Sequence, residues 1–381
     1  MSNRFFIAAA GSGKTQLIVN EVLEKSDEKI LITTFTIANA HSIRERIARQ
    51  NGGFIPSNVV VQTWFSFLLE HGVRPYRFWT KRDEGIELVN GQTKNFQESQ
   101  LNKDGTPNHH YYFKPRSMVI PSDRLSHLVV TCNQVSQGSV ISRLENIYDS
   151  LYIDECQDMA AWDLEVFKLL LSSSINLTLV GDPRQAVYNT SPSSKYKKYA
   201  NGKIKEFLES KECRGIDCLI DITTLNKSYR NSAAICNLSS MLYPDIDTTT
   251  SGLSITSEHM GIFFVKDQDL QEYAAYVKSK GTNTNKTTVA QLRNDIRTKG
   301  VLENVEIWNF GKSKGLEFEH IILHPTAPMK NWFFDTSTPI ADTSKAGFYV
   351  ALTRAFFSVA IIVKEKDVKK KDLPFPLWSA E

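Results

Sequence analysis

Short apolar runs alternate with helical patterns along most of this chain. The runs at residues 5–7, 151–153 and 177–180 are almost continuously apolar, as expected for strands that are buried on both faces of a parallel sheet. After the first run, apolar residues recur on one face of a predicted helix: Leu17, Ile18, Val22 and Leu23. This alternation predicts an α/β fold, and 381 residues are enough for two domains of ordinary size.

The segment between the first predicted strand and helix is glycine-rich and ends in Lys-Thr. It matches the phosphate-loop pattern of a small residue, four residues of any kind, and Gly-Lys-Ser/Thr. We expect its backbone N–H groups to surround phosphate oxygens at the helix N-terminus, with Lys14 reaching the β- and γ-phosphates and Thr15 holding Mg²⁺. A chance Gly/Ala turn is the alternative. The nucleotide-binding candidates are Ala8, Ala9, Ala10, Gly11, Ser12, Gly13, Lys14, Thr15 and Gln16.

Two later strands end in groups that suit ATP hydrolysis. The run at 151–153 leads into Asp154, which suits Mg²⁺, and Glu155, which can polarise an attacking water. The run at 177–180 leads into Gly-Asp-Pro-Arg and then Gln185, whose amide fits a γ-phosphate sensor. For the second segment, an ordinary β-turn at Gly-Asp-Pro is the alternative.

Composition excludes little beyond a membrane protein. The net charge of +3, from 45 basic and 42 acidic residues, does not by itself indicate nucleic-acid binding. No apolar run approaches the roughly 20 residues of a membrane helix, so no membrane partner is expected. The five cysteines are odd in number and unpatterned, which favours reduced thiols and a cytoplasmic location.

Eight ordered motifs extend over nearly the whole chain. They are AAAGSGKT at 8–15, TFTIANA at 34–40, QTWFSF at 62–67, DECQD at 154–158, GDPRQAVY at 181–188, NKSYRN at 226–231, KGLEF at 314–318 and YVALTRA at 349–355. In this order they resemble the motifs of the superfamily 1A DNA helicases of the UvrD/Rep/PcrA type. The resemblance implies two RecA-like parallel-sheet P-loop NTPase domains with a small insertion in the first, and ATP hydrolysis with Mg²⁺ in a cleft between them.

The resemblance also assigns residues that their spacing alone would leave open. It implies that Arg230 and Arg354 reach the γ-phosphate. The catalytic candidates are then Lys14, Asp154, Glu155, Gln185, Arg230 and Arg354. Without the motif around it, each arginine would be interpreted as one partner of a surface ion pair. Glu317 would contact the ribose or orient the cleft. For single-stranded DNA, base stacking and backbone contacts would come from Thr34, Phe35, Thr36, Thr63, Trp64, Ser66 and Tyr188.

The expected domains are a first core at 1–68 and 127–215, a small 1B-like insertion at 69–126, and a second core at 216–381. A strand near 288–290 and a helix at 291–299 resemble the family segment just before its 2B subdomain, and the next strand begins near Val305. This leaves too few residues for 2B, so we expect 2B to be absent. Seven residues precede the phosphate loop, so we expect the family's adenine-recognising glutamine motif to be absent as well.

These features predict an ATP-dependent translocase or helicase acting on single-stranded or tailed DNA, 3′→5′ by resemblance. The alternative is an ATPase and DNA-sensing regulatory subunit of a multi-protein antiviral nuclease complex. Compact UvrD-like subunits of this kind stand beside a nuclease subunit in systems such as Gabija. A kinase or GTPase is disfavoured, because no N-K-x-D base-recognition motif is apparent.

Overall fold

The computed structural model describes residues 3–76, 86–89, 99–114, 117–187, 193–282, 287–368 and 372–379. The chain divides into two compact units. The first comprises Met1–Ile7, Lys14–Pro183 and Tyr188–Asp221; the second comprises Ala8–Gly13, Arg184–Val187 and Ile222–Glu381. The backbone of the phosphate loop is therefore counted with the second unit, whereas Lys14 and Thr15 belong to the first.

The first unit is built on a parallel sheet of six strands. Their order is β3-β2-β6-β7-β1-β8, and every neighbouring pair is parallel. Because the side chains of a strand alternate between the two faces, every strand between the edges needs apolar residues on both sides, and β2 and β6 are buried throughout. The strands are β1 (Asn3–Ile7), β2 (Ile30–Thr34), β3 (Val59–Thr63), β6 (Ser150–Asp154), β7 (Asn176–Gly181) and β8 (Cys218–Asp221).

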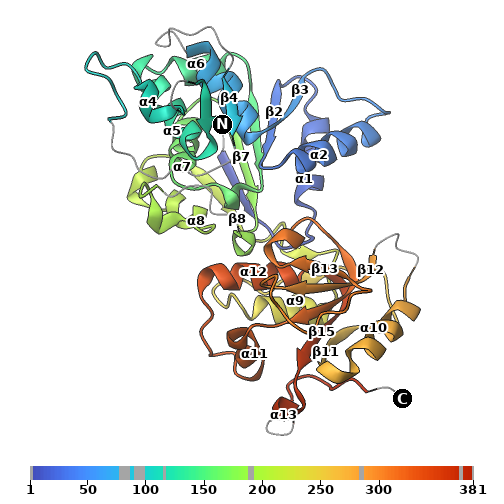
Figure 1. Ribbon diagram of the computed structural model, residues 1–381. Coiled ribbons are helices and arrows are strands. Elements are labelled where there is room, and N and C mark those ends of the chain that lie inside the picture. The colour runs from blue at the N-terminus through green and yellow to red at the C-terminus, as the bar shows by residue number, and fades with distance from the viewer. Residues whose placement is uncertain are drawn as a thin grey trace. The chain divides into compact units, whose positions relative to one another are not determined.

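Helices cover both faces of this sheet. One face packs its alternate residues, such as Leu31 and Ile153, into a core with α5 (Ser122–Val135) and α7 (Trp162–Leu171). On the other face lie α1 (Lys14–Glu24) and α2 (Ile37–Gln50), drawn in blue beside β2 and β3 in Figure 1. Shorter helices complete the unit: α3 (Trp64–Phe67), α6 (Ser139–Glu145) and α8 (Ile204–Leu208).

The described part of the segment between α3 and α5 holds small elements. A single π-helical turn (Leu68–Val73) leads away from α3, and β4 (Glu87–Val89) pairs in parallel with β5 (Val119–Pro121). The short helix α4 (His109–Tyr112) is tied to α5, where the Tyr112 hydroxyl lies 2.6 Å from Thr131 Oγ1. The boundaries 69 and 126 for this insertion stay a prediction.

The second unit has a parallel sheet of five strands in the order β11-β15-β14-β12-β13. One face packs against α10, and the other packs against α9, α11 and α12; Figure 1 shows these helices on opposite sides of the strands. The elements are β11 (Gly261–Lys266), β12 (Thr287–Arg293), β13 (Glu306–Asn309), β14 (Phe318–His324), β15 (Ala355–Val363), α9 (Ala233–Ser240), α10 (Leu270–Ser279), α11 (Ala327–Phe334), α12 (Asp342–Leu352) and α13 (Glu365–Val368), with a small pair β9 (Lys227–Ser228) and β10 (Thr250–Ser251).

The predicted fold class, α/β with two parallel sheets, is confirmed. The helix predicted at 291–299 is wrong, because β12 continues to Arg293 and a turn follows. Asp295 closes that turn by accepting the backbone N–H of Arg297 at 2.8 Å, a side-chain bond that competes with a helix. Twelve residues, 294–305, connect β12 to β13. Within the described ranges, no helix is both long and apolar enough to span a bilayer.

Candidate nucleotide site

The phosphate loop leaves β1 in a backbone conformation that needs glycine. Gly11 and Gly13 have φ angles of +70° and +87°, in the left-handed region that other residues rarely adopt. A Cβ at Gly11 would lie 2.5 Å from Cβ of Arg230 and 2.9 Å from Oγ of Ser228. The loop therefore fits against the NKSYRN segment only with glycine at this position.

The loop also presents groups that suit a phosphate. The Ser12 hydroxyl is buried and has no hydrogen-bond partner within the described residues. The first amides of α1 have no intrahelical partner, as at any helix N-terminus. An uncompensated buried hydroxyl costs free energy, and a phosphate oxygen would satisfy it. These observations fit a nucleoside triphosphate as the occupant.

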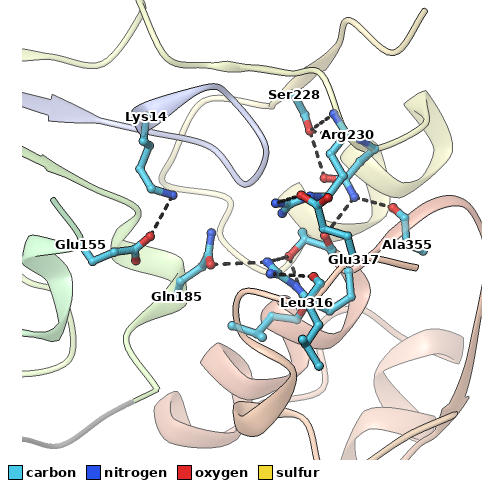
Figure 2. A network of polar contacts seen from close by, with 12 residues as sticks. Lys14, Glu155, Gln185, Ser228, Arg230, Leu316, Glu317 and Ala355 are labelled. Atoms are coloured by element: carbon cyan, nitrogen blue, oxygen red, sulfur yellow. Dashed lines mark hydrogen bonds and ion pairs between the residues drawn. The ribbon is translucent and has the colours of Figure 1, made fainter. Parts of the chain in front are cut away.

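In the first unit, four predicted residues come together at the ends of β1 and β6. Lys14 Nζ lies 3.6 Å from Glu155 Oε1, as Figure 2 shows, and the Thr15 hydroxyl donates to Asp154 Oδ2 at 3.3 Å. Glu155 has a φ angle of +56°, an uncommon conformation for a residue with a side chain. Gln157 holds the Glu155 carboxylate through its amide at 2.5 Å and accepts the backbone N–H of Asp182 at 3.1 Å. The Gln157 side chain thus links the ends of β6 and β7.

The buried carboxylate Asp154 is electrostatically unusual. Burial, followed by the charge of Glu155, raises its pKa to about 6, while Lys14 and the hydrogen bonds to Glu155 N and Thr15 act in the opposite direction. A divalent cation would favour the charged carboxylate. Among the described residues there is no cluster of three or more His, Cys, Asp or Glu able to hold a metal alone. This donor set fits Mg²⁺, which keeps several waters and takes further oxygens from substrate phosphates.

In the second unit, Gln185 and Arg354 contact each other. Both are nearly fully buried, and Arg354 donates from Nη2 to Gln185 Oε1 at 3.4 Å. Two backbone carbonyls orient the guanidinium of Arg354. Its Nε donates to Val350 O at 3.0 Å, and its Nη1 donates to Leu316 O at 3.4 Å. The arginine of the YVALTRA motif is thereby joined to the predicted sensor.

Arg230 is held by Glu317, also in the second unit. Its Nε and Nη2 donate to Glu317 Oε1 at 3.0 and 2.6 Å (Figure 2). The neighbouring Asn231 fixes the backbone, since its amide donates to Thr353 O at 3.1 Å and Ala355 O at 2.6 Å. One side chain thus links the segment carrying Arg230 to the segment carrying Arg354.

Three residues that the sequence reasoning did not single out lie among these groups. Arg184 donates to Ala8 O, Lys314 Nζ donates to Gln185 O at 3.3 Å, and the Tyr349 hydroxyl accepts the N–H of Ala10 at 3.4 Å. All three fall inside the recognised motifs, which was the available signal. The predicted nucleotide contact Gln16, by contrast, donates its amide N–H to Asn20 Oδ1 within α1.

The predicted nucleic-acid contacts differ widely in accessibility. Phe35 is half-buried and packs on Phe65, with ring centroids 5.6 Å apart. Thr36 and Thr63 cap α2 and α3, accepting the N–H groups of Asn39 and Ser66, and the Thr63 hydroxyl also donates to Ser66 Oγ at 2.9 Å. Tyr188 lies outside the described residues.

Two other candidates are inaccessible. Thr34 is fully buried in β2. Trp64 is fully buried as well; its indole N–H donates to Asp163 Oδ1 at 2.8 Å, and its ring packs on Phe167. This corrects the expectation that the Trp64 ring stacks on bases, because the indole N–H is hydrogen-bonded to Asp163 and the ring is packed inside the core.

A family model described as the AAA domain matches residues 2–191. These residues form an AAA-type P-loop domain. The match ends three residues after the GDPRQAVY motif, so this domain holds Lys14, Thr15, Asp154 and Glu155, and Gln185 near its end. An AAA-type P-loop domain implies nucleoside-triphosphate hydrolysis, in general with ATP as the substrate and Mg²⁺ as the cofactor.

The domain is also distantly similar to DNA helicases of the UvrD/Rep family. The ATP-dependent DNA helicase Rep of Buchnera aphidicola subsp. Schizaphis graminum is 23% identical over 235 residues, which cover 48% of this chain and 35% of that protein. A probable DNA helicase II homolog of Mycoplasma capricolum subsp. capricolum is 23% identical over 233 residues, covering 48% and 32%. The chain spans about a third of the length of these relatives.

Solved structures overlap with the chain only loosely. The PRRSV helicase aligns with 98% of this chain and 55% of its own at 15% identity and a TM-score of 0.41. The arterivirus nonstructural protein 10 helicase in complex with DNA aligns with 97% of this chain and 62% of its own at 14% identity and a TM-score of 0.42. Overlaps at this level are too loose to support an argument.

Proposed function

We propose that this chain is an ATP-driven motor of the superfamily 1A type, without a 2B subdomain, that moves along single-stranded DNA. The observation that carries the proposal is the grouping of Lys14, Thr15, Asp154 and Glu155 at the mouth of the phosphate loop. The 3′→5′ direction rests on the resemblance alone.

Each of these residues has a definite role in the proposed hydrolysis. Lys14 exchanges the Glu155 carboxylate for the β- and γ-phosphate oxygens, and this exchange releases Glu155 to orient the attacking water. Thr15 and Asp154 hold Mg²⁺, which supplies charge neutralisation on the phosphates when it is bound with ATP. Gln157 keeps the Glu155 carboxylate in place through the 2.5 Å bond.

The second unit supplies the remaining groups in this proposal. Gln185 contacts the γ-phosphate and the water, while Arg230 and Arg354 stabilise the charge that develops on the transferring phosphoryl group. Because these groups belong to a different unit from Lys14 and Glu155, hydrolysis would require both units to engage one nucleotide. That requirement would couple ATP turnover to movement.

The proposed DNA contacts are reduced to the accessible candidates. Phe35 is the described aromatic best suited to base stacking, because it is half-buried at the end of β2. Tyr188 is proposed on the resemblance alone. Thr36, Thr63 and Ser66 can each add a contact to the DNA backbone, the two threonines while they cap α2 and α3, since a hydroxyl has both donor and acceptor capacity.

Steady-state ATPase assays with and without single-stranded DNA test the proposal. Lys14→Ala should abolish turnover, whereas Lys25→Ala, which removes a lysine paired with Glu28 at 3.0 Å, should leave it intact. Undiminished hydrolysis in the Lys14 variant would refute the site assignment.

A second assay separates the motor from the alternative function. Unwinding of a 3′-tailed duplex by the purified chain supports an autonomous helicase. DNA-stimulated ATP hydrolysis without unwinding supports the DNA-sensing ATPase subunit of an antiviral nuclease complex instead. In that case, adding a purified nuclease subunit should make DNA cleavage depend on ATP.

A further inference from the structure

Arg184 is a buried charged residue to which the proposed chemistry gives no role. It lies in the 3₁₀ turn η4 (Pro183–Gln185), directly before Gln185, and its side chain is only 1% exposed. Its Nη2 donates to the carbonyl of Ala8 at 3.1 Å, and its Nη1 donates to Thr249 Oγ1 at 3.1 Å. Ala8 is the first residue of the phosphate loop. All three residues belong to the second unit.

An aromatic side chain extends this arrangement to a second point on the loop. The guanidinium of Arg184 lies 4.9 Å from the ring centroid of Tyr349, within the range of a cation–π contact. The hydroxyl of the same tyrosine accepts the N–H of Ala10 at 3.4 Å. Arg184 and Tyr349 together therefore hold one carbonyl and one amide in the first half of the loop.

The backbone that follows Arg184 is fixed as well. The carbonyl of Gln185 accepts Lys314 Nζ at 3.3 Å, and its side chain accepts Arg354 Nη2 at 3.4 Å. Without the Arg184 side chain, Ala8 could therefore shift relative to the Gln185 segment, which Lys314 and Arg354 hold. Beyond the pairing of β1 with β7 at Ile7 and Gly181, the guanidinium adds a side-chain link between the start of the phosphate loop and the segment that carries the sensor.

We propose that Arg184 is a positioning residue for ATP hydrolysis, which sets the distance between the phosphate loop and the amide of Gln185. The inference rests on the proposed function, because Gln185 matters only if ATP is hydrolysed. Arg184 itself touches neither nucleotide nor water in this mechanism. Its contribution is to keep Gln185 at the place where the γ-phosphate and the attacking water meet.

The geometry calls for arginine rather than lysine. A planar guanidinium can donate to two acceptors in fixed directions while stacking on a ring, whereas an ammonium is a compact point charge. Lysine at position 184 can keep the positive charge but cannot keep the Ala8, Thr249 and Tyr349 contacts together. Arg184→Lys therefore separates the positioning role from the charge.

The test compares Arg184→Lys with Thr249→Val in the full chain. Thr249→Val removes the hydrogen bond between Arg184 Nη1 and Thr249 Oγ1 but leaves the bond from Arg184 to Ala8 O. We expect Arg184→Lys to lower kcat by about 10- to 100-fold, since a misplacement of about 1 Å can cost about 10²-fold. The affinity for a fluorescent ATP analogue should change less than about threefold, and Thr249→Val should retain a kcat close to that of the wild type. A wild-type kcat for Arg184→Lys, or equal losses of kcat and nucleotide affinity in both variants, would overturn the inference.

Hydrogen exchange of the backbone amides at residues 8–13 gives a readout that does not need turnover. Without nucleotide, Arg184→Lys should exchange faster in this segment than the wild type, and unchanged exchange would refute the inference even if the wild type proved inactive as an ATPase. If Arg184→Lys does not fold, Arg184→Gln provides the same test, because its single amide group cannot keep the contacts to Ala8, Thr249 and the Tyr349 ring together. Absence of ATPase activity in the wild type would refute the proposed function separately.

Discussion

Arg230 and Glu317 form an ion pair in which two guanidinium nitrogens, Nε and Nη2, donate to a single carboxylate oxygen at 3.0 and 2.6 Å. The side chains are 16% and 26% exposed, so the pair is shielded but reachable from solvent. An arginine carries five N–H donors, so the guanidinium can contact a γ-phosphate through Nη1 while Nε and Nη2 stay on Glu317. The carboxylate thereby orients the arginine.

The first prediction is that Arg230→Lys loses most ATPase activity. An arginine that stabilises a transferring phosphoryl group contributes about 10³–10⁵ in kcat, and lysine does not reproduce the two-donor geometry. We expect kcat to fall by about 10³-fold with nucleotide affinity largely kept, measured by ATPase assays and analogue binding. Arg297→Lys is the matched control, because Arg297 is 86% exposed and pairs with Asp295. Equal losses in the two variants would contradict a specific role for Arg230.

The second prediction concerns the glycine that faces Arg230. Gly11→Ala should abolish nucleotide binding, because the added Cβ would lie 2.5 Å from Cβ of Arg230 in a backbone with φ of +70°. Gly300→Ala is the control, since Gly300 has a similar φ of +75° and nothing within 4 Å of an added Cβ. Both variants carry the backbone strain, of order 1 kcal/mol, so only the steric clash differs between them. Binding of a fluorescent ATP analogue measures the difference, and equal affinities would show that the clash is relieved by movement.

The sequence predicted those site residues that directly follow an apolar strand. The phosphate loop, the acids after β6 and the amide after β7 each follow an apolar strand directly, and parallel strands bring such ends to one edge of the sheet. The structure places Lys14, Thr15, Asp154 and Glu155 together in that way. Local sequence patterns were sufficient for these four residues because each lies within a few positions of the strand that precedes it.

What the sequence could not predict depends on contacts between distant segments. Trp64 belongs to a motif associated with DNA, yet its burial is decided by Asp163 and Phe167, about a hundred positions later. The contact between Arg184 and Ala8 spans 176 positions. The helix at 291–299 was predicted from the family resemblance, and the structure has a turn there instead, closed by a side-chain hydrogen bond of Asp295 that the resemblance does not indicate.

The third prediction separates a core tryptophan from a DNA-stacking phenylalanine. Trp64→Phe removes the indole N–H that Asp163 accepts, so we expect a loss of about 1–3 kcal/mol in the free energy of unfolding and unchanged affinity for single-stranded DNA. Phe35→Ala should instead weaken DNA binding by about 1–3 kcal/mol, the range for one base–aromatic stack. Chemical denaturation and fluorescence anisotropy with a labelled oligonucleotide measure the two effects. Weaker DNA binding in Trp64→Phe with unchanged stability would reverse our assignment.

The last prediction is that mild acid destabilises the second unit through buried histidines. Burial lowers the pKa values of His259, His320 and His324 to about 4, from an ordinary value of 6.5. The unfolded chain therefore binds more protons between these values, so stability is complete above about pH 6.5 and falls as the pH drops toward 4. Each unit of pKa difference corresponds to about 1.4 kcal/mol.

His320 is the residue of choice for this test. Its Nδ1 lies 2.8 Å from Ser358 Oγ, while its Nε2 is buried with no hydrogen-bond partner in the described part of the chain. Protonation would place a charge on this buried ring, which burial and His259 disfavour more than Glu319 favours. His320→Gln should reduce the drop in melting temperature between pH 7.5 and pH 5, whereas His41→Gln, on the exposed surface of α2, should leave the drop unchanged. The same pH dependence in wild type and His320→Gln would show that acid acts on other groups.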